Sequence, residues 1–335
     1  MLSIGKRRGL AALAAPNGTF SMLALDHRNS FRRLTAGIFP DGADWARMVD
    51  EKARLARALL PHASAALLDP LYGAGPLVAR GVVPGAKGFL VALEQSGYRD
   101  TPEGRVNRVE PGWSVAAIAR LGAAGVKLLI QYHPGAANAA AQEDLVARTA
   151  EACAARGLPL VLEPVTYAPE GDKTAPEFQA ALPELIPQVA ARLGALGVDL
   201  LKLEFPLAGH QDPARMEAAC AGVSAATDLP WVVLSAAVPF DTFLAQTRAA
   251  CAGGASGFLA GRSVWQEAMA LADPAARDGY LARVAAPRMA ALRAVTDAAA
   301  TPWTDRPGAG LPALSEGWHL AHAAPAPRPV RRPPE

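Results

Sequence analysis

The stretch Val198-Asp199-Leu200-Leu201-Lys202-Leu203-Glu204-Phe205-Pro206 is a short apolar run with a lysine in its middle. Such a run is typical of a strand that is buried on both faces, as in a parallel sheet. Side chains alternate along a strand, so Lys202 and Glu204 share one face with Leu200, and the other face is entirely apolar. We expect helices to cover the apolar face, which leaves the amine and the carboxylate in a closed interior.

An unpaired charge in such an interior is costly, so a buried lysine loses its proton more easily and becomes a nucleophile. The alternative is that Lys202 reaches water at the strand end or pairs with Glu204. The chain has only six lysines among its 33 basic residues. A lysine inside an apolar strand of an arginine-rich protein favours the chemical role.

Seven further apolar runs surround this one, and helical stretches separate them. We predict strands at residues 20–26, 64–69, 88–94, 126–132, 158–165, 199–206, 230–237 and 257–261. We predict helices at residues 44–60, 113–122, 139–156, 176–196, 213–226, 240–252 and 274–299. Repeated β-then-α units indicate a parallel sheet, and the number eight favours closure into a barrel.

The predicted fold is therefore α/β, a single (β/α)8 TIM barrel over residues 1–300. The basic start Lys6-Arg7-Arg8 and the apolar residues 9–15 resemble a secretory signal, but the apolar part is at the short limit for one. We therefore predict an N-terminal helical extension of the barrel. Residues 301–335 are rich in Pro, Ala and Arg without apolar periodicity, which predicts a disordered tail.

Composition excludes some partners and points to a compartment. The net charge of +2 argues against nucleic-acid or membrane-surface binding, and no apolar run is long enough to span a bilayer. The three cysteines lie in alanine-rich helical stretches and read as buried thiols of a cytoplasmic protein. We expect a small-molecule substrate, and a homo-oligomer is compatible with the sequence.

Polar residues collect at the ends of the predicted strands, where the active sites of such barrels lie. These residues are Asp26, Asp69, Glu94, Glu163, Glu204, Ser235 and Arg262. The alternation rule places Asp26, Lys127 and Glu163 on faces that we assign to the barrel interior.

Two interior lysines, Lys127 and Lys202, have a clear chemical use. A neighbouring ammonium lowers the pKa of the reacting amine, which attacks a ketone to form a Schiff base. The iminium then accepts electrons, so a carbon–carbon bond can break once a base removes a hydroxyl proton. Glu163, on the strand between the two lysines, is the candidate base. Alternatively, Lys127 is a structural partner of Asp26 or Glu163, and Glu163 is only a counter-ion.

The last two predicted strands end in Leu234-Ser235-Ala236-Ala237 and Ala260-Gly261-Arg262-Ser263. Small residues let backbone amides approach a ligand, and Arg262 supplies a fixed positive charge. Phosphate sites in these barrels are commonly built after strands seven and eight, so we predict one here.

Eight segments carry a resemblance to a known family. They are MLALDHR at 22–28, LLDPLYG at 67–73, LEQSGY at 93–98, VKLLIQY at 126–132, VLEPVTY at 161–167, LLKLEFP at 200–206, WVVLSAA at 231–237 and ASGFLAGRSVW at 255–265. They resemble class I aldolases of the tagatose 1,6-bisphosphate aldolase family, which includes the sulfofructose-phosphate aldolases. The similarity extends over about residues 15–295 in a single register.

The resemblance implies a (β/α)8 barrel that uses neither a metal nor a cofactor. It implies that Lys202 forms the Schiff base, that Glu163 handles the proton at C4, and that Asp26 and Lys127 complete the catalytic set. The family's phosphate loops map onto Ser235, Ala236, Gly261 and Arg262. The implied reaction is cleavage of a phosphorylated ketose, tagatose 1,6-bisphosphate-like, to dihydroxyacetone phosphate and an aldehyde.

Two departures leave the substrate open. Family members commonly read Asp-Gln-Arg where this chain has Asp26-His27-Arg28, and often have a glycine where it has Ala237. His27 and the Tyr132-His133-Pro134 sequence also resemble an aldolase-like domain of inositol catabolism. The alternatives are therefore 6-deoxy-6-sulfofructose 1-phosphate and 2-deoxy-5-keto-gluconate 6-phosphate. Arg28 is the leading candidate to bind the distal phosphate, sulfonate or carboxylate.

Two other classes of function remain open. A metal-dependent class II aldolase or isomerase would use histidines, and His27, His133 and His210 each follow a predicted strand. A non-catalytic sugar-phosphate sensor would keep the barrel without turnover. EDTA sensitivity would reveal the first, and release of an unchanged ketose phosphate would reveal the second.

Overall fold

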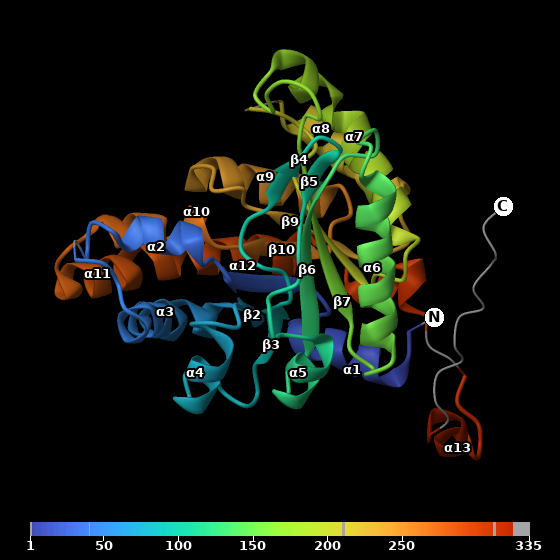
Figure 1. The fold of residues 1–335 in the computed structure, drawn as a ribbon, viewed down its shortest axis with the longest axis horizontal. Coiled ribbons are helices and arrows are strands. Elements are labelled where there is room, and N and C mark those ends of the chain that lie inside the picture. Colours follow the sequence, from blue (N-terminus) through green and yellow to red (C-terminus); the bar gives the residue numbers. More distant parts are fainter. Residues whose placement is uncertain (1, 40, 210–211, 311–312, 324–335) are drawn as a thin grey trace.

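The computed structural model describes residues 2–39, 41–209, 212–310 and 313–323. Eight parallel strands close into a barrel in the order β1-β10-β9-β8-β7-β6-β3-β2 (Figure 1). They are β1 (Phe20–Leu25), β2 (Ala65–Leu68), β3 (Gly88–Ala92), β6 (Gly125–Tyr132), β7 (Leu160–Thr166), β8 (Leu200–Leu203), β9 (Trp231–Leu234) and β10 (Gly257–Ala260). The predicted (β/α)8 barrel is confirmed, and each predicted strand overlaps one of these eight.

Helices surround the barrel and follow the predicted pattern. They are α2 (Asn29–Thr35), α3 (Trp45–Leu59), α4 (Ala74–Ala79), α5 (Val115–Arg120), α6 (Ala139–Ala154), α7 (Pro176–Gly194), α8 (Pro213–Ala225), α9 (Phe240–Ala252), α10 (Arg262–Trp265), α11 (Pro274–Tyr280) and α12 (Ala286–Ala299). A π-helical turn (Leu281–Ala285) joins α11 to α12, so the predicted helix 274–299 is continuous. Pro287 lacks an N–H group and crowds the preceding turn, which a π turn relieves.

The side chains on the two faces of β8 lie in two different cores, as the alternation predicts. Leu201 and Leu203 lie in the core between the strands and the surrounding helices. Leu200 lies in a second core inside the barrel, together with Val161 of β7 and Val232 of β9. Lys202 shares the face of Leu200 and therefore points into the barrel.

The predicted N-terminal helix is confirmed as α1 (Ile4–Leu13), which closes the end of the barrel where the strands begin (Figure 1). Leu10 and Leu13 belong to the interior core, and Lys6 forms a buried ion pair with Asp199 at 2.8 Å. Gly9 must lack a side chain, because a Cβ there would lie 2.3 Å from the carbonyl oxygen of Ala124. The helix leaves the opposite end of the barrel open.

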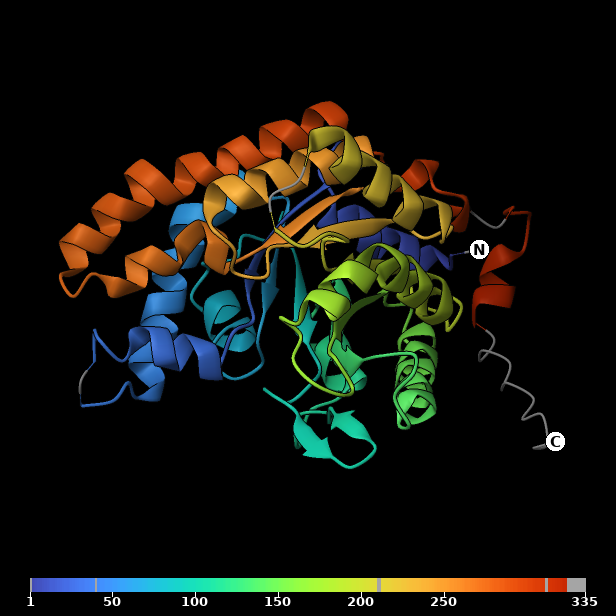
Figure 2. The ribbon, with the colours of Figure 1, turned by 90° about the horizontal axis from the view of Figure 1, so that it is seen from above.

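A small antiparallel hairpin, β4 (Arg99–Thr101) and β5 (Gly104–Val106), was not predicted. It projects from the barrel between β3 and β6 (Figure 2). The side chains of Asn138 and Gln142 donate hydrogen bonds to the Arg105 carbonyl at 2.8 and 2.7 Å. Its strands are only three residues long, β4 is mostly exposed and β5 half-buried, so no apolar alternation marks them in the sequence.

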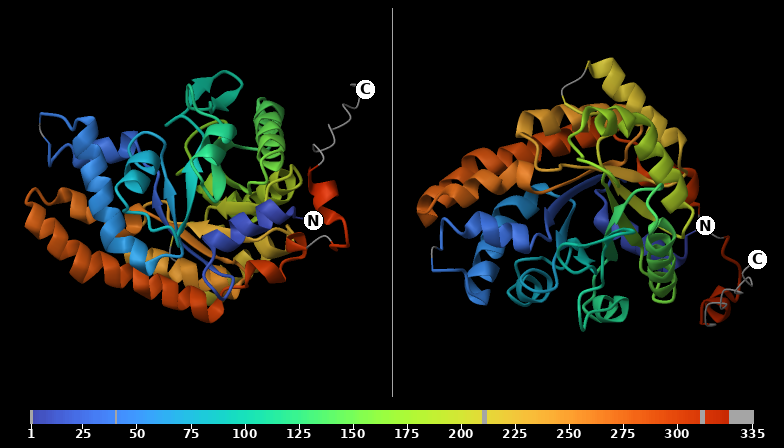
Figure 3. Two further views of the ribbon diagram at one scale, coloured as in Figure 1. Left: turned by 90° about the horizontal axis from the view of Figure 1, so that it is seen from below. Right: turned by 45° about the horizontal axis from the view of Figure 1, so that its top comes forward.

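The predicted start of the disordered tail at residue 301 is wrong. Trp303 is only 2% exposed and belongs to the interior core, and Arg306 donates a hydrogen bond to the Ser224 carbonyl at 2.8 Å. One buried tryptophan and one arginine anchor this Pro-rich segment, which has no periodic pattern. Helix α13 (Trp318–Ala323) lies apart from the barrel (Figure 3). Residues 324–335 of the predicted tail lie outside the described residues.

No helix within the described part of the chain is both long and apolar enough to cross a membrane.

Candidate active site

A cavity of about 530 Å³ opens at the ends of the strands, and all nine predicted site residues line it. They are Asp26, Arg28, Lys127, Glu163, Lys202, Ser235, Ala236, Gly261 and Arg262. A larger groove of about 1230 Å³ lies beside α1, but it contains none of them and carries no cluster of acids and lysines. The smaller cavity is the candidate active site, because catalytic residues of these barrels lie at the carboxyl ends of the strands.

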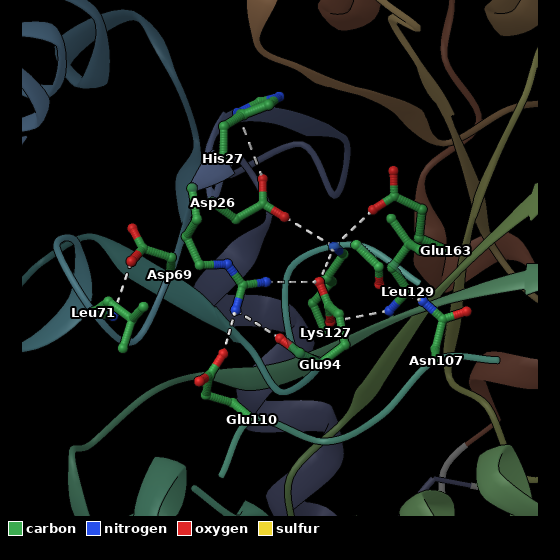
Figure 4. Close-up of polar contacts among 12 residues, drawn as sticks. Asp26, His27, Asp69, Leu71, Glu94, Asn107, Glu110, Lys127, Leu129 and Glu163 are labelled. Atoms are coloured by element: carbon green, nitrogen blue, oxygen red, sulfur yellow. Dashed lines mark hydrogen bonds and ion pairs between the residues drawn. The ribbon is translucent and has the colours of Figure 1, made fainter. Parts of the chain in front are cut away.

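Lys127 is the centre of a buried charge cluster (Figure 4). Its Nζ atom lies 2.8 Å from Asp26 Oδ2, 2.6 Å from Glu94 Oε1 and 2.9 Å from Glu163 Oε2. Burial alone would lower the pKa of Lys127, but the carboxylates of Asp26, Glu163 and Glu94 outweigh it and hold the pKa well above its ordinary value. Lys127 is therefore a permanent ammonium.

Glu163 of β7 bridges the lysines of the two neighbouring strands. Its Oε1 atom lies 2.8 Å from Lys202 Nζ, and its Oε2 atom forms the ion pair with Lys127. The Oε2 contact has the distance but not the geometry of a hydrogen bond, and no other described residue donates to this buried atom. Burial would raise the pKa of Glu163, but Lys127 and Lys202 hold it below its ordinary value. Glu163 is therefore a carboxylate with a free lone pair beside Lys202.

Asp26, at the end of β1, is a carboxylate for the same reason. Burial would raise its pKa, but Lys127 and then Lys202 hold the pKa well below the ordinary range of an aspartate. Lys202 itself is 5% exposed, and its ion-pair partner within the described residues is Glu163. The site thus contains two lysines in different settings. Lys202 lies beside a carboxylate that can accept a proton, whereas Lys127 stays charged.

Glu94 is a site residue whose role the sequence reasoning missed, although its position at a strand end was noted. Besides its ion pair with Lys127, it accepts a hydrogen bond from the Leu129 amide at 3.1 Å. It is 3% exposed. Its buried position between β3 and β6 fixes the Lys127 ammonium.

Arg28 lines the cavity, and its guanidinium is tied into the protein. Its guanidinium is 5% exposed, donates to the Glu94 carbonyl at 2.6 Å and forms an ion pair with Glu110 at 3.2 Å. This arrangement ties the end of β1 to the segment after β3, from which the hairpin projects. The guanidinium is therefore paired with acidic residues inside the protein, and its contact with the distal group of the substrate stays a prediction.

The loop after β9 has a strained conformation. The Val238 amide donates to the Ser235 carbonyl at 3.0 Å, and the two central residues, Ala236 and Ala237, have φ values of 45° and 61°. Positive φ at both central positions is typical of a type I′ turn and costs alanine about 1–2 kcal/mol per residue. Among the described residues, neither alanine amide has a hydrogen-bond acceptor. Strain that leaves amides unpaired beside a cavity is typical of a binding loop.

The loop after β10 lies against the loop after β9. The single Ser263 hydroxyl lies between two carbonyl acceptors, that of Val238 at 2.6 Å and that of Ser235 at 3.2 Å. Gly261 must be glycine, because a Cβ there would lie 2.7 Å from His27 Cε1. Arg262 has no ion-pair partner among the described residues, and burial lowers its pKa. A half-buried guanidinium beside free amides is a favourable place for an anion.

Glu204 and Lys173 close one side of the cavity mouth. Glu204 forms an ion pair with Lys173 and accepts a hydrogen bond from the Thr166 amide at 2.7 Å. The alternative pairing of Lys202 with Glu204 is therefore wrong, since Lys202 pairs with Glu163. Lys173 was missed because it lies in the loop between β7 and α7, where neighbouring residues carry no pattern.

Of the three histidines of the metal alternative, the two within the described residues lie in different places. His27 lines the cavity, whereas His133 packs against Tyr167 and Phe178 with ring centroids 6.5 and 6.4 Å away. His210 lies outside the described residues. Over the part of the chain that the structure describes, no three His, Cys, Asp or Glu side chains are grouped to hold a metal ion.

The charge cluster predicts a pH-dependent stability effect. Lys127→Met should lower the free energy of unfolding by about 3–5 kcal/mol at pH 8, because three buried carboxylates lose their cation. Carboxylates with lowered pKa values stabilise the fold above their ordinary values of 3.8 and 4.5 and lose that contribution as the pH falls. Without Lys127 these groups take up protons at a higher pH, so the loss should be smaller at pH 5.

Urea unfolding of wild type and variant at both pH values measures this effect. The control is Arg148→Ala, which removes an exposed ion pair with Asp144 and should cost about 1 kcal/mol or less. A Lys127→Met variant no less stable than this control would show that the cluster is not held by Lys127.

The chain is similar to known proteins in sequence and in fold. The sequence profile of the DeoC/LacD family aldolases matches residues 20–267. The chain is 30% identical over 283 residues to tagatose 1,6-diphosphate aldolase 2 of Enterococcus faecalis, which covers 79% of this chain and 84% of that protein. It is also 30% identical over 326 residues to tagatose 1,6-diphosphate aldolase 2 of Streptococcus pyogenes, which covers 91% of this chain and 98% of that protein.

Solved structures support the fold. An archaeal fructose 1,6-bisphosphate aldolase superposes with a TM-score of 0.57 at 21% identity, covering 87% of this chain and 98% of that one. Fructose-bisphosphate aldolase from Plasmodium falciparum superposes with a TM-score of 0.64 at 13% identity, covering 90% of this chain and 97% of that one.

Proposed function

Because the chain belongs to the DeoC/LacD family of aldolases, which are carbon–carbon lyases, we propose that it cleaves a phosphorylated ketose through a Schiff base on Lys202. The observation that carries this proposal is the Lys202–Glu163–Lys127 arrangement. A buried amine lies 2.8 Å from a carboxylate that a second, permanently charged lysine keeps ionised. Such a set can form an imine and then move a proton beside it.

The first step forms the imine. Lys202 transfers one proton to Glu163, and its neutral amine attacks the ketone carbon of the substrate. The resulting carbinolamine takes a proton on its hydroxyl and loses water, which leaves a protonated imine on Nζ. Lys127 keeps the Glu163 carboxylate ionised, so that it is ready to accept this proton.

The second step breaks the carbon–carbon bond. Glu163, deprotonated again, takes the proton of the C4 hydroxyl, and the C4 oxygen forms a carbonyl as the C3–C4 bond breaks. The bond electrons move into the imine, which becomes an enamine, and the aldehyde leaves. Protonation of the enamine at C3 and hydrolysis of the imine release dihydroxyacetone phosphate and restore Lys202.

The C1 phosphate is assigned to the loops after β9 and β10. The unpaired amides of Ala236 and Ala237, with Ser235 and Gly261 beside them, offer hydrogen bonds, and Arg262 offers a charge without an internal partner. Binding there positions the ketone over Lys202, which lies on the neighbouring strand β8.

The substrate that fits best is a tagatose 1,6-bisphosphate-like ketose, supported by two aldolases of that name at 30% identity. The test is a screen of purified protein against tagatose 1,6-bisphosphate, 6-deoxy-6-sulfofructose 1-phosphate and 2-deoxy-5-keto-gluconate 6-phosphate, following the three-carbon product. Preferred turnover of the first substrate supports this assignment. Binding of all three without turnover would contradict the enzyme function proposed here.

Arg262→Ala is expected to lower kcat/KM for phosphorylated substrates by a factor that corresponds to about 2–4 kcal/mol, because it truncates one partner of a buried charge contact. Arg262→Lys should recover only part of this, because the planar guanidinium is lost. Unphosphorylated dihydroxyacetone never uses the site and should react about equally with all three proteins. Steady-state kinetics with both donors measure the difference.

The matched control is Arg32→Ala, since Arg32 is an exposed arginine of α2 whose guanidinium donates to Ala43 and Tyr72. If Arg262→Ala slows both donors equally and lowers the melting temperature, Arg262 only ties α10 to the rim.

A further inference from the structure

We propose that His27 contacts the ketose directly, with Nδ1–H directed at Asp26 and Nε2 accepting a hydrogen bond from a sugar hydroxyl. This inference rests on the proposed function and deepens it. It assigns a hydroxyl-binding position to the side of the cavity between β1 and β10.

The His27 ring is fixed by its surroundings. This ring and that of Trp265 form a T-shaped contact at 84° with centroids 5.4 Å apart, and Cε1 lies against the bare Cα of Gly261. The main chain is fixed as well, because Lys52 Nζ donates to the His27 carbonyl at 2.7 Å. The ring therefore lines the cavity in one orientation.

The two ring nitrogens differ in their environment. Nδ1 is buried without a hydrogen-bond partner and lies 3.9 Å from Asp26 Oδ1 (Figure 4). That distance is too long for a hydrogen bond, but such contacts often tighten when substrate binds. Asp26 can accept this bond, since its other oxygen, Oδ2, already accepts from Lys127. Within the described residues Nε2 has no partner, so it is the nitrogen available to a ligand.

The imidazole is neutral at physiological pH. Burial lowers the pKa of His27 to about 3, and the positive charges of Arg262, Lys52 and Lys202 oppose protonation further, against the opposite effect of Asp26. A neutral imidazole offers one N–H group and one lone pair. With the N–H group directed at Asp26, the lone pair faces the cavity.

The Nε2 lone pair of His27 favours a substrate group that donates a hydrogen bond. A hydroxyl can donate to it, whereas the oxygens of a phosphate, sulfonate or carboxylate only accept and would be repelled. No anionic group of the substrate therefore belongs beside Nε2 of His27, and the carbon that lies next to Asp26 carries a hydroxyl group.

Three substitutions separate the roles of the two nitrogens. Glutamine places its amide near the position of Nε2, asparagine places it near Nδ1, and phenylalanine keeps only the ring. Each variant is assayed for cleavage of tagatose 1,6-bisphosphate, for thermal unfolding, and for the imine trapped by borohydride with dihydroxyacetone phosphate. Wild-type imine formation tests the proposed function separately from the role of His27.

We expect His27→Gln to keep kcat/KM within about threefold of wild type, and His27→Asn and His27→Phe to lose roughly tenfold or more, the usual effect of one hydrogen bond left unmade. All three should still form the imine with similar melting temperatures. If asparagine rescues and glutamine does not, His27 serves only Asp26 and the proposal is wrong. If phenylalanine matches wild type, the ring only fills space, which also overturns it.

Discussion

Lys202→Met should reduce cleavage of the ketose phosphate by about 10⁴-fold or more, because the reaction loses its nucleophile. Methionine occupies a similar volume in the barrel interior, so the fold should be retained. Dihydroxyacetone phosphate should still bind through the loops after β9 and β10. The measurements are release of the three-carbon product and equilibrium binding of dihydroxyacetone phosphate.

The matched control is Lys87→Met, which replaces a lysine at the opposite end of the barrel whose Nζ contacts the Ala63 carbonyl. This control should cleave substrate at the wild-type rate. A Lys202→Met protein with cleavage within tenfold of wild type would mean that another group forms the covalent intermediate.

Glu163→Gln should lower cleavage by roughly 10²- to 10⁴-fold, the range for loss of an acid–base group. The amide keeps the size of the side chain but cannot take the C4 hydroxyl proton. Imine formation should be slower yet still complete, because solvent can remove the proton from Lys202 on a longer timescale. Single-turnover cleavage, compared with the amount of imine trapped by borohydride, separates the two steps.

Glu184→Gln on the exposed face of α7 is the control for loss of a glutamate charge. Near-normal cleavage by Glu163→Gln would reduce Glu163 to a counter-ion of the two lysines. Complete loss of the imine would instead place Glu163 only in the first step.

The parts of the site that the sequence predicted depend on short-range rules. The alternation along one strand put Lys202 on the inner face with Leu200, and the same rule placed Lys127 and Glu163 on the neighbouring strands. Parallel strands end together at one edge of the barrel. The sequence therefore predicts that residues 36 and more positions apart in the chain lie close together, even when the loop conformations are unknown. The barrel itself followed from counting strand and helix alternations.

The parts that the sequence could not predict depend on pairings between distant loops. The ion pairs of Arg28 with Glu110 and of Lys173 with Glu204 form only once the loops are folded. Nothing in the local sequence of Arg28 distinguishes a buried ion pair from a substrate contact. The packed segment around Trp303 was missed because one buried tryptophan in a Pro-rich stretch creates no periodicity.

The positive φ values of Ala236 and Ala237 were also beyond reach. Alanine normally favours a helix, and only the tertiary arrangement of the two loops imposes a left-handed turn on it. The sequence did predict a binding loop there, but from small residues and not from strain.

The most direct test of the Schiff-base function is borohydride reduction in the presence of dihydroxyacetone phosphate, followed by peptide mass spectrometry. We expect a stable adduct on the peptide that contains Lys202, and none in Lys202→Met. An adduct confined to the peptide that contains Lys127, or no adduct on either peptide, would contradict the assignment of Lys202 as the imine-forming residue.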